Sequence, residues 1–158
     1  MSDIVLEIAF HQREAVMRIP VARREYERLA ESLKCLAMGD THIHNFFLLP
    51  MSDTALVLFS IKDLQYIHCL EKGATAKAPV VEGLEIYLHN RTEPLTVQLD
   101  PEGPIHDLLL EMLETHYGDD PQGCVMTPDL DGNPLFFRPD DVDCIFLNAR
   151  YLAGYRPE

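Results

Sequence analysis

The chain has 158 residues, of which 47% are hydrophobic, and it carries a formal net charge of −13 at pH 7. This hydrophobic content is enough to bury a core, which excludes a disordered chain. The negative charge disfavours direct binding to nucleic acid or to an anionic membrane surface.

No apolar run is long enough to span a bilayer, and the N-terminal stretch lacks the features of a signal peptide. The four cysteines lie far apart and form no CxxC pair, so we expect reduced thiols. Together these observations predict a cytoplasmic protein without membrane contact.

The first half opens on an alternating pattern. Apolar residues occupy every second position from Ile4 to Phe10, which is typical of a strand with one buried face. A turn leads to a second strand that ends near Ile19, and a helix follows Pro20 and stops at Gly39. Three short strands are expected after this helix, at residues 46–51, 54–60 and 64–70.

The second half repeats this order of elements. A hairpin is expected within residues 83–100, and a helix follows from Pro104 to a stop at Gly118. Three short strands are again expected to close the half, at residues 124–127, 134–137 and 142–147.

Two blocks of sequence indicate an internal duplication. LEIAFHQR at residues 6–13 matches LEIYLHNR at residues 84–91, and the same offset of 78 aligns the apolar pattern of residues 56–72 with that of residues 134–150. We therefore predict an α+β fold, built as a tandem duplication of a ββαβββ unit with one main helix per copy. The sheet is expected to be mostly antiparallel, with the copies in a pseudo-two-fold arrangement.

The predicted first repeat spans residues 1–72, a linker spans 73–82, and the second repeat spans 83–158. The repeats form either two units or one compact pseudo-symmetric domain. Residues 1–78 carry 9 basic and 10 acidic residues, whereas residues 79–158 carry 4 and 16. The second repeat therefore holds nearly all of the excess negative charge.

The two matching octets share a histidine and an arginine at corresponding positions. His11, Arg13, His89 and Arg91 are therefore candidate ligand-binding residues, because such groups bind anions and transfer protons. In the alternative interpretation these residues are inherited remnants of two matching hairpins.

The stretch GDTHIHNFF is the candidate metal site. His42 and His44 are two residues apart, so they would lie on one face of a strand and could offer two imidazole ligands to zinc. Ordinary polar loop residues are the alternative. The acidic stretch at residues 129–134 resembles a calcium loop less than it resembles a hairpin turn, because proline stands where the loop glycine belongs.

The sequence contains no nucleophile motif, so no catalytic residue is assigned. We expect a non-catalytic binding or regulatory module, such as an adaptor, an inhibitor or a regulatory subunit, whose acidic second half binds a basic protein surface. Asp107, Glu111 and Glu114 on the second helix are the candidate partner-binding residues. The arginine-rich first helix of another copy could meet this acidic helix, which would give a homo-oligomer. The alternative function is a small-ligand or metal-binding protein, enzymes included, with a pocket at the junction of the repeats.

Overall fold

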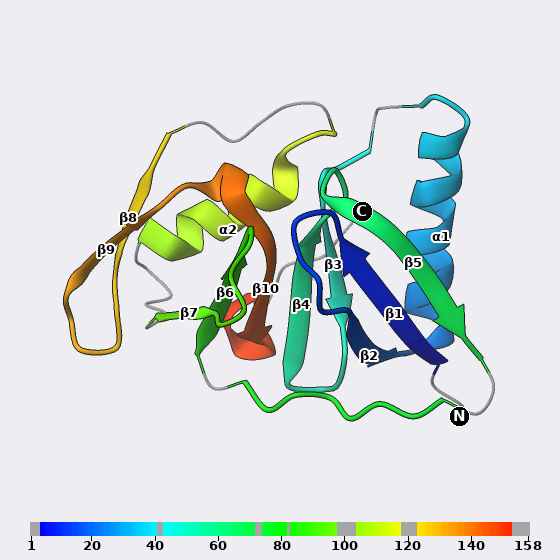
Figure 1. The fold of residues 1–158 in the computed structure, drawn as a ribbon, viewed down its shortest axis with the longest axis horizontal. Helices are drawn as coiled ribbons and strands as arrows, with labels where there is room; N and C mark the ends of the chain where they lie inside the picture. The colour runs from blue at the N-terminus through cyan, green and yellow to red at the C-terminus, as the bar shows by residue number, and fades with distance from the viewer. Residues whose placement is uncertain are drawn as a thin grey trace.

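The structure is a computed structural model, and it shows an α+β fold with two α-helices and antiparallel sheets (Figure 1). Within the part of the chain that it describes, neither helix is long and apolar enough to cross a membrane. The described residues are 4–40, 43–71, 74–81, 83–97, 104–117 and 123–152.

The elements follow in the same order in both halves of the chain: two strands, one helix and three strands. In addition, one 3₁₀ helix precedes the last strand and another follows it. The first half contains β1 (Ile4–Phe10), β2 (Met17–Val21), α1 (Arg23–Ala37), β3 (Phe46–Pro50), β4 (Ala55–Ser60) and β5 (Leu64–Leu70). The second half contains β6 (Leu84–Leu88), β7 (Leu95–Val97), α2 (Pro104–Glu114), β8 (Val125–Pro128), β9 (Pro134–Phe137), η1 (Pro139–Asp141), β10 (Val142–Asn148) and η2 (Ala149–Leu152).

A five-stranded sheet with the order β3-β4-β10-β6-β7 takes strands from both halves. Nearly every residue of β3, β4 and β10 is apolar, a composition typical of strands that are covered on both faces. Side chains alternate along a strand, so successive residues enter different cores. Phe46 and Leu48 face one core, whereas Phe47 and Leu49 face the other. The sheet therefore divides the hydrophobic interior into two.

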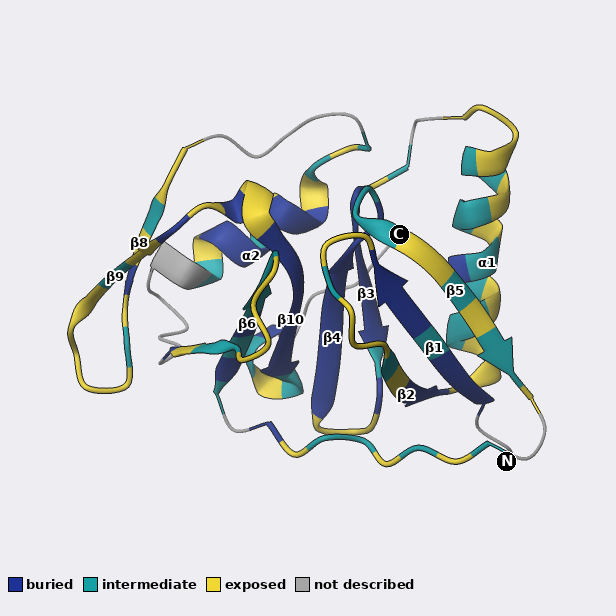
Figure 2. Ribbon diagram, in the orientation of Figure 1, coloured by how far each residue is buried: buried dark blue, intermediate teal, exposed yellow. Residues whose placement is uncertain are grey.

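A different layer covers each face of this sheet. The first core includes α2, whose Leu109 and Met112 are fully buried, and the β8–β9 hairpin, which contributes Phe137. The second core includes the separate β2-β1-β5 sheet, which contributes Leu6, and α1, which contributes Leu29. Figure 2 shows that β1, β3, β4 and β10 are almost wholly buried.

The two halves pair their strands in the same register. Leu6 lies opposite Ile19 in the first half. In the second half Leu84 lies opposite Val97, and the offset between the octets predicts these two residues as the counterparts of Leu6 and Ile19. The pairs β1–β5 and β6–β10 also agree, including the place of a β-bulge, as do the hairpins β3–β4 and β8–β9. One pair departs from this correspondence, because β4 joins β10 while β5 and β9 lie in different sheets.

Two element boundaries differ from the sequence-based expectation. β2 continues through Pro20 to Val21, which is tolerated because β2 is an edge strand that can lack one backbone donor. The second helix ends at Glu114 rather than near Gly118, a position outside the described residues.

Replacing Leu58 tests the shared sheet. This β4 residue is fully buried in the first core, so Leu58→Ala should lower the free energy of unfolding by about 2–5 kcal/mol. Urea denaturation measures the loss, and Val80→Ala is the control because Val80 is 85% exposed. A loss no greater than that of the control would contradict this packing.

Candidate functional site at the junction of the halves

The hairpin turns that open the two halves lie against each other. The Asn90 N–H donates to the Gln12 carbonyl at 3.0 Å, and nearby Lys62 forms an ion pair with Asp140. In both pairs the partners are separated by the offset that relates the two octets, so counterpart positions of the two halves contact each other. A cavity of about 450 Å³ lies between the two turns.

Arg13 extends from the first turn into the second half. Its side chain is only 7% exposed, and its guanidinium donates to the carbonyls of Arg91 at 2.6 Å and Leu88 at 2.9 Å. Its Nε also lies 3.4 Å from Asp143 Oδ2, and the guanidinium lies over the Tyr87 ring. Since all of these partners belong to the second half, Arg13 links the halves by charge and by hydrogen bonds.

Asp143 is a fully buried carboxylate in β10, whose other residues up to Leu147 are apolar. Burial raises the pKa of its carboxyl, although His89 and Arg13 act in the opposite direction. The residue lies at the bulge where the pairing of β10 with β6 shifts between Val142 and Cys144. Because a bulge redirects the local side chains, it explains how a carboxylate on a core strand reaches the junction.

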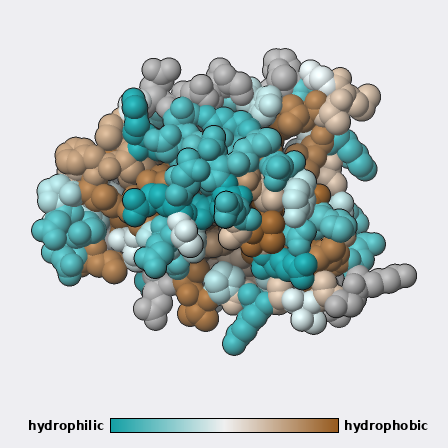
Figure 3. Space-filling model, viewed as in Figure 1, coloured by the Kyte–Doolittle hydropathy of each residue, from teal (hydrophilic) through white to brown (hydrophobic). Residues whose placement is uncertain are grey.

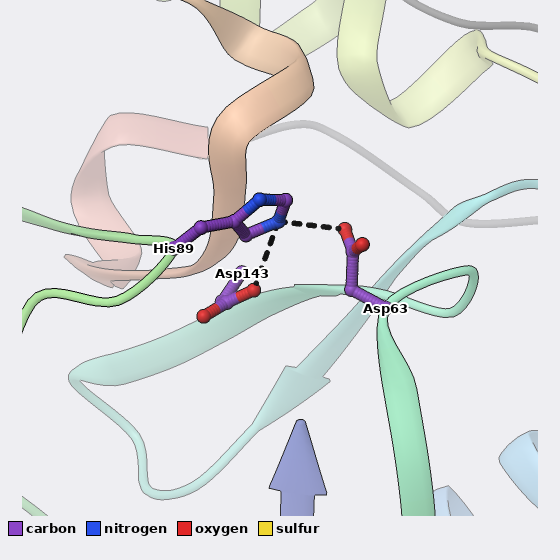
Figure 4. A group of neighbouring side chains, drawn as sticks. All are labelled: Asp63, His89 and Asp143. Carbon is purple, nitrogen blue, oxygen red and sulfur yellow. Dashed lines mark ion pairs between the residues drawn. The ribbon is translucent and has the colours of Figure 1, made fainter. Parts of the chain in front are cut away.

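His89 lies between two carboxylates, as Figure 4 shows. Its Nε2 is 3.2 Å from Asp143 Oδ1 and 3.4 Å from Asp63 Oδ2. The Ser60 hydroxyl donates to Asp63 at 2.8 Å and so orients that carboxylate. The His89 backbone N–H donates to the Asp141 carbonyl at 2.8 Å. The corner after β4, the turn after β6 and strand β10 therefore build the group together.

Several polar atoms of this group are buried and make no hydrogen bond to the described residues: Arg13 Nε, His89 Nε2 and both carboxylate oxygens of Asp143. Such atoms are uncommon in native proteins, where a protein group, water or an ion usually satisfies them. Asp63, His89 and Asp143 each offer one ligand atom, and these atoms all lie within 4.8 Å of one another. The group can therefore hold a proton on His89 or bind a divalent metal ion.

The structure brings together two of the four candidate ligand-binding residues from the matching octets. Arg13 and His89 lie together with Asp63 and Asp143 in one cluster, which we call the junction group. The side chains of His11 and Arg91 are exposed. His11 contributes its backbone N–H, which donates to the Asp63 carbonyl at 2.9 Å. A ligand-binding role for the four residues stays a prediction.

The predicted HxH metal site lies elsewhere in the fold. His44 is exposed and packs edge-on against His116, with 5.1 Å between ring centroids. His42 lies outside the described residues. Among the residues that are described, one set of three or more His, Cys, Asp or Glu has suitable spacing for a metal. This set is Asp63, His89 and Asp143 of the junction group. Zinc binding by His42 and His44 stays a prediction.

The predicted partner-binding residues lie on α2. Asp107, Glu111 and Glu114 are all exposed, and their spacing of four and three residues places them along one side of the helix. The opposite side of α2 is buried in the first core. The structure therefore presents these carboxylates as one acidic stripe, defined by the three residues.

Sequence reasoning did not assign Asp63 or Asp143 to a site. The available signal was the lone carboxylate in the run from Val142 to Leu147, because a buried strand rarely contains an uncompensated charge. At the offset of the octets, the counterpart of Asp143 in the first half is Gln65. The buried carboxylate thus occurs in one half only.

Comparison of the chain with protein-family models, with curated proteins and with solved structures finds no match.

Removing the Arg13 guanidinium tests its role in the junction. Arg13→Ala leaves Asp143 buried beside an imidazole alone, and breaking a buried ion pair in this way costs about 3–5 kcal/mol. The free energy of unfolding should fall by about that amount in chemical denaturation. Arg91→Ala is the matched control, because the exposed counterpart side chain should change stability by less than about 0.5 kcal/mol. Equal losses in the two variants would contradict the assignment.

Proposed function

We propose that the protein is a non-catalytic binding module that binds a divalent metal ion at its junction group, with zinc as the first candidate. The spacing of the ligand atoms supports this proposal. Tetrahedral ligands with bonds of about 2.0–2.1 Å lie about 3.3–3.4 Å apart. His89 Nε2 lies 3.2 Å from Asp143 Oδ1 and 3.4 Å from Asp63 Oδ2. Imidazole nitrogen and carboxylate oxygen are also ligands that zinc accepts.

Charge and burial agree with a bound cation. Two carboxylates approach one imidazole nitrogen, and burial of Asp143 makes an uncompensated negative charge costly. Arg13 supplies one positive charge to this group. A proton on His89 would supply a second positive charge and is the competing explanation. Metal binding must displace that proton, so the two explanations differ in an experiment.

Zinc titration of protein that was purified without an affinity tag and treated with EDTA separates these explanations. We expect calorimetry to show one ion per chain with release of protons. Zinc at about 100 times the Kd should raise the free energy of unfolding by about 2.7 kcal/mol. Asp63→Asn should weaken zinc binding by more than about tenfold.

The controls use the other histidines. His11→Gln changes the exposed counterpart of His89 and should leave zinc binding unchanged. Loss of zinc binding in His44→Ala, with retention in Asp63→Asn, would move the metal to the HxH stretch. No binding heat and an unchanged melting temperature in the unmodified protein would overturn the proposal.

A second function is favoured by the acidic stripe. Three exposed carboxylates on one side of α2, in the half with most of the negative charge, suit a protein partner with a basic surface. This interaction would make the protein an adaptor, an inhibitor or a regulatory subunit.

A lysine-rich peptide is the probe for the acidic stripe. Neutralising Asp107, Glu111 and Glu114 together as the corresponding amides should weaken peptide binding several-fold at low salt, because these charges are concentrated on one surface. The control removes the same number of charges elsewhere in the second half, at Glu85, Glu93 and Asp131. Equal weakening in both triple variants would show that net charge, and not this surface, determines binding.

The agreement in register supports a further part of the proposal, a tandem duplication of a ββαβββ unit with a pseudo-two-fold arrangement. Residues 1–72 and 83–158 would be the two repeats. All four cysteines are free thiols, which favours a reducing compartment such as the cytoplasm.

A further inference from the structure

The pairing of β4 with β10 has no counterpart among the described strands of the other half. β4 of the first half pairs with β10 of the second half. The corresponding pair would join β9 to β5, because these strands occupy the equivalent places in the other half. Within the described residues β5 pairs only with β1, and β9 pairs only with β8. Figure 1 places the β8–β9 hairpin on the opposite side of the molecule from β5.

The helices differ in the same way. α2 packs on β8 of its own half and on β3 of the other half. α1 packs on β3 of its own half, and comparable packing on β8 is not found in the described part of the chain. Both differences have one cause, because the β8–β9 hairpin does not cover β5 and α1.

The face of the hairpin that lacks a cover is apolar. Phe136 is 65% exposed and Met126 is 44% exposed. Their counterparts in the first half, Leu58 and Leu48, are buried in the first core. Figure 3 shows apolar side chains at the surface on the side where Figure 1 places this hairpin.

A matching hollow lies beside β5. Leu33 and Leu36 of α1 and Leu64 and Ile67 of β5 help to line a cavity of about 370 Å³. Most of its lining comes from α1 and β5, the two elements that the hairpin leaves uncovered, and His11, Ile61, Lys62 and Tyr117 complete it.

We propose that the β8–β9 hairpin of a second copy pairs with the free edge of β5 and covers α1, in a reciprocal dimer. Strand addition at an exposed sheet edge is a common mode of association. A two-fold dimer makes the same contact twice, so both hairpins and both edges are used.

The β4–β10 register predicts the register of the contact. Each residue of the β4–β10 pair has a counterpart 78 positions away in the other half. The counterparts of Leu58 and Ile145 are Phe136 and Ile67, and those of Leu56 and Leu147 are Pro134 and Cys69, so Phe136 would lie opposite Ile67 and Pro134 opposite Cys69. Phe136 then enters the hollow at α1. Pro134 has no N–H to donate, so the ladder has fewer bonds than that of β4 and β10, which favours a reversible dimer.

The second copy fits this role better than the hairpin of the same chain. The other face of the hairpin already packs on α2, where Phe137 and Thr127 are buried. The hairpin can keep this packing and still offer its open face and the free edge of β9 to another molecule. Moving to β5 of its own chain would first expose Phe137.

A disulfide trap tests both the contact and its register. Pro134→Cys, with the exposed Cys124 replaced by serine, should form an oxidised dimer in which mass spectrometry links position 134 of one chain to Cys69 of the other. Asn133→Cys in the same background is the control, because its side chain would point to the other face of the sheet. A link within one chain, or equal trapping by both variants, would overturn the proposal.

Sedimentation equilibrium tests the contact without a crosslink. Phe136→Asp should weaken dimerisation by about tenfold or more, because a buried aromatic ring becomes a carboxylate. Val80→Asp adds the same charge at an exposed position outside the contact and should have little effect. Raising the salt concentration should not dissociate the dimer, whereas binding through the acidic stripe should weaken. A monomer at all concentrations would overturn the proposal, and Asp63→Asn should dimerise normally whether or not zinc binds.

Discussion

The pairing of β4 with β10 is the contact on which the rest of the structure depends. Both strands are buried on both faces, so each side of this pair contributes to a different core. Without the pair, the five-stranded sheet would separate into a hairpin of the first half and a three-stranded piece of the second half. The same pair positions the corner after β4 beside the bulge of β10, where the carboxylates of Asp63 and Asp143 approach His89.

Buried charge is the second constraint. An apolar residue at position 143 would be compatible with the rest of β10, and burial of a carboxylate opposes folding unless it is compensated. Arg13 provides part of that compensation from the other half of the chain. A compensated buried charge of this kind adds little net stability, and it disfavours arrangements of the two halves that would separate Asp143 from Arg13. The hypothesis that this position serves a ligand is consistent with its restriction to one half.

The local structure could be predicted from the sequence to a large extent. β5 and β9 occupy the expected residues because turn signals bound their apolar runs on both sides. The α+β class followed from the order of such elements. The choice of partner strands could not be predicted, because it depends on packing between segments that are distant along the chain. Periodicity gives the faces of β4 and β10 but does not show that they pair.

The site was predictable only in part, for a similar reason. The matching octets drew attention to Arg13 and His89, and both belong to the junction group. Asp63 matches Asp141 at the same offset, but neither Asp63 nor Asp143 belongs to an octet. Asp143 reaches His89 through the pairing of β10 with β6, and Asp63 reaches it only when β4 joins β10. A bulge also decides where the carboxylate of Asp143 points, and no sequence pattern in β10 indicates that bulge.

The position of β4 also has a consequence for synthesis on the ribosome. About 80 residues, from 61 to 141, separate the end of β4 from the start of β10. The chain grows at about 5–20 residues per second. For several seconds the nascent first half therefore has an apolar strand, β4, that is paired with β3 but lacks its other sheet neighbour, β10. Contacts between such distant segments are also slow to form after release, because closing the long loop costs entropy before any pairing is gained. The β3–β4 hairpin is thus open to misfolding and to chaperones until β10 has been made.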